Sequence, residues 1–157
     1  MEKQTLHFEY EVYSDIAALP EADAWLLKEA REVTAQAYAP YSRFQVGAVI
    51  RLENGEIVAG TNQENASFPI GLCAERVALA SAASVYPNVA IDTVAISYHN
   101  LNGSSGHPIS PCGICRQTLS EYETKQDAPI RLILGGLTGK VYIVKRANDL
   151  LPLAFNF

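Results

Sequence analysis

Three cysteines carry the side chains best suited to chemistry in this sequence. Cys73 begins one predicted helix, and Cys112 and Cys115 form a Cys-x-x-Cys pair at the start of another. The positive end of a helix dipole favours a thiolate, by about 0.3–1 kcal/mol for each helix end. If the two helix starts face each other, three thiolates meet at one point. Three protein ligands with an open fourth position are typical of a catalytic zinc site.

The spacing of the cysteines also allows other interpretations. A structural zinc would be closed by a fourth ligand, for which His99 and His107 are the candidates. Cys73 could instead be a small buried residue. The odd number of cysteines, with no secretion signal at the N-terminus, argues against a disulfide scaffold.

Two neighbouring residues favour the catalytic interpretation. Pro111 precedes the Cys-x-x-Cys pair, and Glu75 follows Cys73 by two positions. Zinc deaminases combine a Pro-Cys-x-x-Cys half with a ligand-x-Glu half, in which the glutamate transfers protons and does not bind the metal. We therefore expect Glu75 to be the general acid–base group; the alternative is a carboxylate that only stabilises a helix N-terminus.

Arg76 lies in the otherwise apolar stretch GLCAERVAL (71–79). Three thiolates around one Zn²⁺ leave an excess of negative charge, and Arg76 follows Cys73 by three positions, on the same side of a helix. We expect Arg76 to donate hydrogen bonds to the sulfurs and to offset their charge. The alternative is a solvated charge on the helix surface.

The elements that must position these residues alternate along the chain. Hydrophobic periodicity, proline positions and the Asn54-Gly55 turn predict strands at 5–13, 44–52, 57–62, 92–99, 130–136 and 139–145, and helices at 21–38, 73–86 and 112–124, with a short helical turn near 147–155. This order predicts an α/β fold in which helices cover both faces of a single mixed sheet.

Composition excludes several classes of protein. The 157 residues suit one domain, 1–157, with a full hydrophobic core. The net charge of −5 argues against a nucleic-acid partner, which normally requires a basic surface. No apolar run approaches the roughly 18 residues of a membrane span, and no targeting segment is visible, so a cytoplasmic protein is expected.

Five motifs in this order resemble those of the small homotetrameric cytidine deaminases, over roughly residues 21–155. They are YSRFQVGA (41–48), GTNQENASF (60–68), CAERVAL (73–79), SPCGICRQ (110–117) and LLPLAF (150–155). The resemblance implies a three-layer α/β/α sandwich with a five-stranded mixed sheet, and a homotetramer with active sites at subunit interfaces. It also implies zinc-dependent hydrolysis of cytidine and 2′-deoxycytidine to uridine and 2′-deoxyuridine, with release of ammonia.

The resemblance assigns roles to individual residues. The zinc ligands are Cys73, Cys112 and Cys115, and the proton-transferring glutamate is Glu75. Substrate contacts fall on Phe44 and Ala74 (the base), Asn62 and Glu64 (the ribose hydroxyls) and Phe155 (supplied by a neighbouring subunit). Without the motifs, Asn62 and Glu64 would be read as polar loop residues, and both phenylalanines as core aromatics.

The sequence also departs from the family pattern. Residues 1–20 extend beyond the compact core as a strand-like addition, and Phe68 stands where many relatives carry Tyr. The loop at 100–110 is rich in Gly and Ser. Three alternative functions are a deaminase of blasticidin-type nucleoside analogues, a polynucleotide deaminase, which the acidic charge disfavours, and a zinc-stabilised binding protein without turnover.

Overall fold

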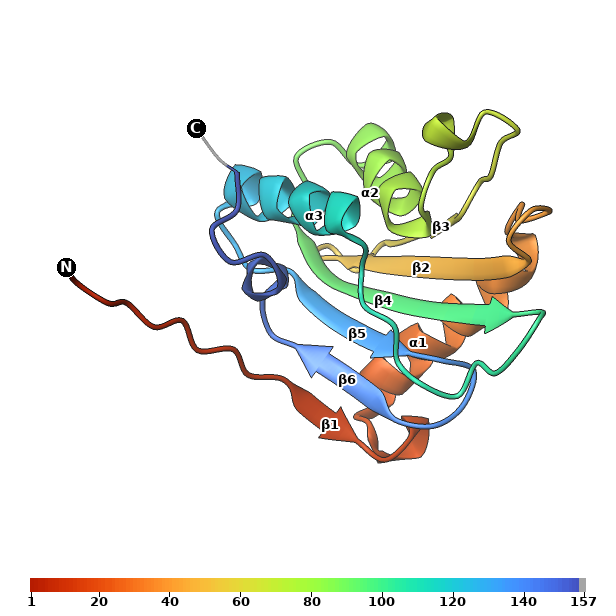
Figure 1. The fold of residues 1–157 in the computed structure, drawn as a ribbon, viewed down its shortest axis with the longest axis horizontal. Coiled ribbons are helices and arrows are strands. Elements are labelled where there is room, and N and C mark those ends of the chain that lie inside the picture. The colour runs from red at the N-terminus through yellow and green to blue at the C-terminus, as the bar shows by residue number, and fades with distance from the viewer. Residues whose placement is uncertain (156–157) are drawn as a thin grey trace.

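A six-stranded mixed sheet forms the centre of the computed structural model, which describes residues 1–155 (Figure 1). Its strands lie in the order β1-β6-β5-β4-β2-β3. Their bounds are β1 Glu11–Tyr13, β2 Phe44–Leu52, β3 Ile57–Thr61, β4 Ile91–Asn100, β5 Arg131–Gly135 and β6 Val141–Val144. Only the β4–β5 pair is parallel among these strands. The resemblance implied a five-stranded sheet, and the observed sheet has a sixth strand at its edge, β1, which lies within the predicted strand 5–13.

Helices cover both faces of the sheet, as the sequence predicted. Helix α1 (Glu21–Val33) lies on one face, and α2 (Ala74–Val85) and α3 (Gly113–Gln126) lie on the other (Figure 1). The predicted helix 21–38 stops being α-helical at Val33 and continues as a short 3₁₀ turn, Thr34–Gln36, before Pro40. No helix in the described range 1–155 is long and apolar enough to cross a bilayer.

The two faces have separate hydrophobic cores. Alternate residues of the central strands point to opposite sides, so the apolar run of β2 is buried on both faces. The α1 core contains Leu26, Leu27, Ala30, Val49, Ala95 and Ile133. The α2–α3 core contains Ala78, Leu79, Leu119, Ile50, Ile96 and Leu132. Burial at this scale, roughly 1.5–3 kcal/mol for each large aliphatic side chain, fixes the layers.

Gly60 of β3 sets the distance between the sheet and the start of α2. A Cβ atom at Gly60 would collide with the backbone of Ala74 and Ala78. The absence of a side chain therefore lets the first turn of α2, directly after Cys73, approach the sheet closely. This contact fixes the height of that turn above the sheet.

The N-terminal strand is shorter than predicted. Alternation predicted a strand over 5–13, but only Glu11–Tyr13 pairs, antiparallel, with β6. Residues 1–10 are exposed and extend away from the body (Figure 1). Pairing ends at Glu11, opposite Ile143, one residue before β6 itself ends at Val144, and residues 1–10 form no strand despite their alternating pattern.

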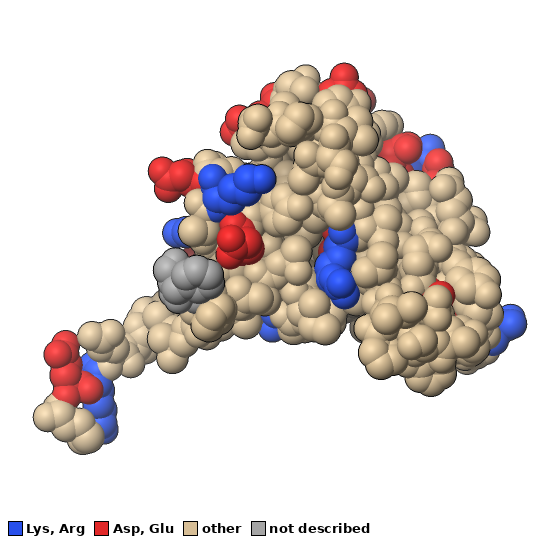
Figure 2. Space-filling model, turned by 90° about the horizontal axis from the view of Figure 1, so that it is seen from above, with Lys and Arg blue, Asp and Glu red and all other residues tan. Residues whose placement is uncertain are grey.

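The face seen from above in Figure 2 carries scattered charges of both signs. In Figure 2, the coloured Lys and Arg side chains of the described residues stand singly or beside acidic ones and form no continuous basic patch on this face. Several large apolar side chains are exposed around the molecule, including Phe68, Ile70, Ile114 and Phe155. Where such groups are contiguous they mark a surface for protein–protein contact.

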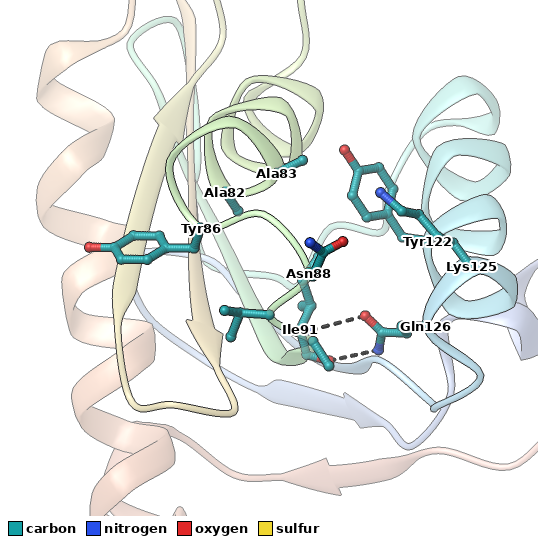
Figure 3. Close-up of a pocket in the computed structure, with 10 residues that line it drawn as sticks. Ala82, Ala83, Tyr86, Asn88, Ile91, Tyr122, Lys125 and Gln126 are labelled. Atoms are coloured by element: carbon teal, nitrogen blue, oxygen red, sulfur yellow. Dashed lines mark hydrogen bonds between the residues drawn. The ribbon is translucent and has the colours of Figure 1, made fainter.

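A pocket of about 300 Å³ separates the C-terminal ends of α2 and α3 (Figure 3). At its floor the Gln126 amide bonds both the N–H and the C=O of Ile91, at 3.0 and 2.9 Å. These bonds tie the end of α3 to the start of β4. The pocket lies at the opposite ends of the two helices from the cysteines.

Candidate functional site

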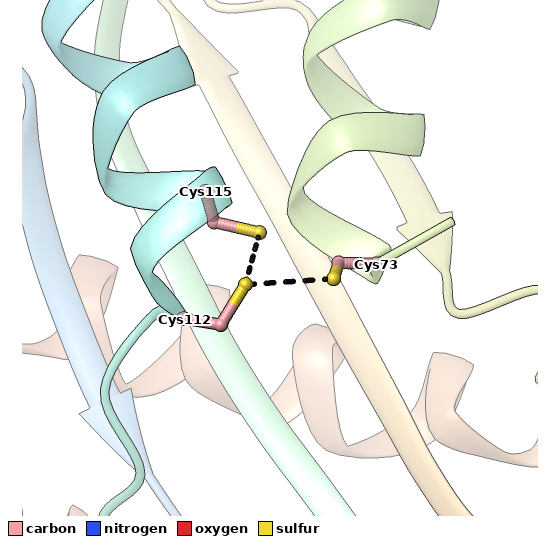
Figure 4. A group of neighbouring side chains, drawn as sticks. All are labelled: Cys73, Cys112 and Cys115. Atoms are coloured by element: carbon pink, nitrogen blue, oxygen red, sulfur yellow. Dashed lines mark hydrogen bonds between the residues drawn. The ribbon is translucent and has the colours of Figure 1, made fainter. Parts of the chain in front are cut away.

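The three cysteine sulfurs converge where α2 and α3 begin (Figure 4). Cys73 and Cys112 are the N-cap residues of α2 and α3, and neither side chain caps its own helix. The Sγ atoms of Cys73 and Cys112 lie 3.7 Å apart, and those of Cys112 and Cys115 lie 3.4 Å apart. The predicted meeting of two helix starts is confirmed.

This donor set fits a zinc ion. Sulfurs bound tetrahedrally at about 2.3 Å from one zinc would lie about 3.8 Å from each other, close to the observed separations. All three cysteines are free thiols. No further His, Cys, Asp or Glu joins the group in the described part of the chain. His107, one candidate for a fourth ligand, instead contacts the Tyr98 hydroxyl through Nδ1 at 3.1 Å.

The pKa values of Cys73 and Cys115 are shifted in opposite directions. Hydrogen bonding from Cys115 is the main cause that lowers the pKa of Cys73 to about 6; the bond from Cys112 and the charge of Arg76 act in the same direction, against burial. The same bond and burial raise the pKa of Cys115. The cluster thus favours a thiolate on Cys73, and a metal must displace the remaining protons.

Glu75 lies in the first turn of α2 and is 5% exposed. Burial is the main cause that raises the pKa of its carboxyl, and the negative charge of Cys73 adds to it. Hydrogen bonds from its own backbone N–H and from Cys115 act in the opposite direction. A desolvated carboxyl with a raised pKa is suited to accept and return a proton near neutral pH.

Arg76 makes no hydrogen bond to a sulfur among residues 1–155 as the structure places them. Its positive charge nevertheless contributes to the lowered pKa of Cys73. The side chain lines a groove between α2 and α3, together with Leu72 and Thr118. The predicted hydrogen bonds to sulfur stay a prediction for the zinc-loaded protein.

A cleft of about 390 Å³ opens beside the sulfurs. Its wall contains the predicted residues Cys73, Cys112, Glu75, Phe44, Asn62, Glu64 and Ala74. Phe155 does not line this cleft; its backbone carbonyl accepts a hydrogen bond from Gln117 at 2.9 Å. The fold therefore brings most of the predicted site residues of one chain to this cleft. The exceptions are Cys115, which is buried behind the cleft wall in the sulfur cluster, Arg76, which lies in the adjacent groove, and Phe155, for which a neighbouring subunit was predicted.

Asn62 holds the backbone of β2 beside the cleft. Its Oδ1 accepts from the N–H of Val46 at 2.8 Å, and its Nδ2 donates to the carbonyl of Phe44 at 2.9 Å. The amide thus hydrogen-bonds backbone groups, which is the role expected if Asn62 is a polar loop residue. A second amide proton remains for a ligand.

Glu64 is fixed in a similar way. Its Oε2 accepts from the backbone N–H groups of Tyr41 and Ser42, at 2.9 and 3.2 Å. Burial would raise the pKa of this carboxyl, but hydrogen bonds from the Ser42 side chain and from both backbone groups lower it overall. Glu64 is therefore an ionised acceptor at neutral pH, held rigidly at the cleft wall.

An aromatic stack supports one wall of the cleft. The ring of Phe44 lies parallel to that of Tyr98, with centroids 4.8 Å apart and planes 14° apart. Tyr98 is almost completely buried on β4. Its partner ring is thereby held in one orientation, suitable for a planar ligand.

Sequence reasoning missed several lining residues. Ile109 and Ser110 line the cleft from the end of the loop that precedes α3, and Leu72 and Gln63 pair through their backbones below it. The available signal was position: these residues adjoin Pro111, Cys73 or Asn62 in sequence. Tyr98 carried no such signal, because only the sheet register brings it to Phe44.

Comparison with known proteins places the chain among deaminases. The family model described as "Cytidine and deoxycytidylate deaminase zinc-binding region" matches residues 20–127. The chain is 40% identical to a cytidine deaminase of Halalkalibacterium halodurans over 130 residues, 83% of this chain and 91% of that protein. It is 34% identical to a Mycobacterium tuberculosis cytidine deaminase over 141 residues, 87% of this chain and 92% of the other.

Solved structures and a more distant relative give a similar picture. The crystal structure of cytidine deaminase from Burkholderia pseudomallei superposes with a TM-score of 0.73 at 34% identity, covering 87% of this chain and all of the other. A blasticidin-S deaminase of Bacillus cereus is 29% identical over 140 residues, 87% of this chain and 94% of that protein. The structural match confirms the predicted fold class.

Proposed function

The chain belongs to the cytidine and deoxycytidylate deaminase family, and from this premise we propose that it hydrolyses cytidine and 2′-deoxycytidine to uridine and 2′-deoxyuridine, with release of ammonia. The observation that carries the proposal is the cleft whose wall contains Cys73, Cys112 and the buried Glu75, with Cys115 completing the sulfur cluster behind it. Ring contacts and polar groups line the remainder of the same cleft.

Cys73, Cys112 and Cys115 would hold one Zn²⁺ per chain. When bound, zinc supplies Lewis-acid activation of water at near-neutral pH. The family description and the separations of the sulfurs support this ligand set.

Glu75 acts as the proton carrier of the reaction. Its carboxylate accepts a proton from the attacking water and delivers it to N3 of the pyrimidine, while C4 gains oxygen. The proton of the new C4 hydroxyl then passes through Glu75 to the amine, the bond between C4 and the amine nitrogen breaks, and ammonia leaves. The raised pKa of Glu75 suits both directions of transfer, and a positioned carboxyl of this kind contributes roughly 10²–10⁴-fold in rate.

The remaining cleft residues bind the nucleoside. Phe44, supported by Tyr98, packs against the base, and the backbone at Ala74 contacts the pyrimidine edge. The second proton of the Asn62 amide and the other carboxylate oxygen of Glu64 take the ribose hydroxyls. Both groups are already fixed by backbone contacts, so little side-chain entropy is lost on binding.

We also propose that residues 1–157 act as one deaminase domain in a cytoplasmic homotetramer. Phe155 is 71% exposed and does not line the cleft of its own chain, which supports a contribution to the cleft of a neighbouring subunit. The exposed apolar residues Phe68 and Ile70, close to the cleft, are suited to a subunit interface.

An ultraviolet assay of cytidine and 2′-deoxycytidine tests the proposal. Zinc-loaded protein should convert both, and a strong chelator should abolish the conversion. Unchanged spectra with zinc-loaded protein would favour a zinc-stabilised binding protein instead.

Deamination of a nucleoside analogue is the second candidate function, favoured by the similarity to the blasticidin-S deaminase. Blasticidin S is therefore included in the same assay at equal concentration. Preferred conversion of blasticidin S over cytidine would replace the first proposal.

A further inference from the structure

Arg116 joins two segments that are distant in sequence. This half-buried residue follows Cys115 in the first turn of α3. Its Nε donates to the carbonyl of Pro111 at 2.8 Å, and a terminal nitrogen donates to the carbonyl of Leu150 at 3.0 Å. Among the described residues, no carboxylate forms an ion pair with Arg116.

The first of these segments contains a cysteine of the candidate zinc site. Pro111 is buried and directly precedes Cys112, whose own backbone carbonyl accepts the Arg116 N–H at 2.9 Å. The Arg116 side chain therefore holds the carbonyl directly before Cys112, and the Arg116 backbone N–H makes the ordinary helical bond to the carbonyl of Cys112. The Cys112 side chain makes no capping bond to α3, so these backbone contacts restrict its position.

The second segment is the 3₁₀ turn Ala147–Leu150, which begins the C-terminal part of the chain. The buried carboxylate of Glu123 accepts from the N–H groups of Ala147 and Asn148, at 2.8 and 3.2 Å. Glu123 follows Arg116 by seven residues, two helical turns, so both side chains lie on the same face of α3. Glu123 holds the beginning of the turn, and Arg116 holds its end.

The same helix makes a third contact further along the chain. Gln117 donates to the carbonyl of Phe155 at 2.9 Å. Helix α3 thus begins with two of the cysteines and also carries the C-terminal segment that ends near Phe155. The cysteines at the start of α3 and the C-terminal segment are therefore both attached to this helix.

We propose that Arg116 is a positioning residue that fixes Cys112 and the C-terminal segment relative to each other. The inference rests on the proposed function, because zinc at Cys112 and nucleoside contact by Phe155 give the coupling its consequence. A guanidinium suits this task because its donors point in different directions from one rigid plane. A lysine ammonium is a single point and does not reproduce both bonds.

Arg116→Gln and Arg116→Lys test the proposal, with Arg146→Gln as the matched control. Arg146 is exposed at the other end of the same turn, and its side chain makes no hydrogen bond or ion pair within residues 1–155. Two quantities are measured below the unfolding transition of each variant: the rate of zinc release to a chromogenic chelator, and KM and kcat for cytidine. Partners of metal ligands typically change affinity or activity about 10–100-fold, so Arg116→Gln should release zinc at least tenfold faster and raise KM.

Lysine at the same position should give an intermediate release rate, and Arg146→Gln should match the wild type within about twofold. Glu123→Gln supplies a second comparison, because Glu123 contacts the turn but not Pro111. It should raise KM while zinc release stays close to the wild-type rate.

Unchanged zinc release in Arg116→Gln would overturn the proposal, even if the variant melts at a lower temperature. Equal acceleration in Glu123→Gln would also overturn it, because the effect would then be a general loosening of α3. If the wild type binds zinc but does not convert cytidine, the proposed function fails, while the zinc-release comparison still decides the role of Arg116.

Discussion

Single residues in this site serve two purposes at once. Asn62 and Glu64 satisfy backbone groups and still present a free donor or acceptor to the cleft. Glu75 is desolvated beside the sulfurs, a position that would only destabilise a carboxyl without a task. Chemistry and folding therefore constrain the same atoms.

Glu75→Gln should leave zinc content and the unfolding temperature close to wild type but lower kcat at least 10²-fold. The amide keeps the shape of the side chain and cannot carry the proton, whose positioned transfer contributes roughly 10²–10⁴-fold. Steady-state kinetics with zinc measured by atomic absorption checks this. The control is Glu121→Gln, an exposed carboxylate on α3, which should keep full activity; near-normal turnover in Glu75→Gln would remove the assignment.

Glu64→Gln should raise KM for cytidine about 10–100-fold with a smaller effect on kcat. Hydrogen bonds to charged groups contribute about 1.5–3 kcal/mol, and the amide oxygen still accepts from Tyr41 and Ser42, so the loop keeps its shape. The exposed Glu53 supplies the control, Glu53→Gln, which should leave KM unchanged.

Free cytosine, which has no ribose, should be a poor substrate of the wild type. Equal rates for cytosine and cytidine would contradict ribose recognition.

At the scale of elements, close contacts between helices and sheet position the site. Gly60 lets α2 approach β3, so that Cys73 and Glu75 come to the cleft at a fixed height. On the other face, α1 is attached to β5 by a bidentate ion pair. The Arg131 guanidinium donates to both Asp23 oxygens, at 2.8 and 2.6 Å, and this contact raises the pKa of Arg131.

Asp23→Asn should lower the free energy of unfolding by about 2–3 kcal/mol. Removing one partner of a buried pair costs about 3–5 kcal/mol, and the 29% exposure of the Arg131 side chain reduces this penalty. Denaturant unfolding checks the value. Glu32→Gln is the control, because the Lys28–Glu32 pair is 66% and 59% exposed and should contribute less than about 0.5 kcal/mol. Equal effects of the two substitutions would mean that the Asp23–Arg131 pair contributes no more than a surface pair.

At the scale of the whole molecule, the site described in one chain lacks Phe155. The C-terminal segment runs along α3 and leaves the Phe155 side chain exposed. The proposed tetramer would bring this side chain into a neighbouring cleft. Each active site then contains residues from two chains, which makes activity dependent on assembly.

Mixing two inactive variants tests this arrangement. Phe155→Ala retains Glu75, and Glu75→Gln retains Phe155, so mixed tetramers should regain up to about a quarter of wild-type activity if neighbours are random. Subunits are exchanged or co-expressed and assayed with cytidine. The control mixes Glu75→Gln with Cys112→Ala, two defects of the same cleft, and should regain nothing. No recovery in the first mixture, or equal recovery in both, would contradict contribution of Phe155 by a neighbour.

The sequence by itself determined the elements and the candidate ligands. Periodicity, prolines and the Asn-Gly turn gave the order of helices and strands, and the helix starts at Cys73 and Cys112 placed three thiols where they could meet. These signals are local, because capping, dipoles and side-chain alternation act over a few residues.

Only the tertiary structure decided the features that depend on a partner distant in sequence. Strand β1 is confined to Glu11–Tyr13, the three residues that pair with β6, although the alternating pattern begins at residue 5. Tyr98 supports Phe44 through the sheet register, and Arg116 finds the carbonyl of Leu150 through the packing of α3. The physical reason is the same in each case: alternation or charge shows that a group needs a partner, but the folded chain determines which partner is within reach.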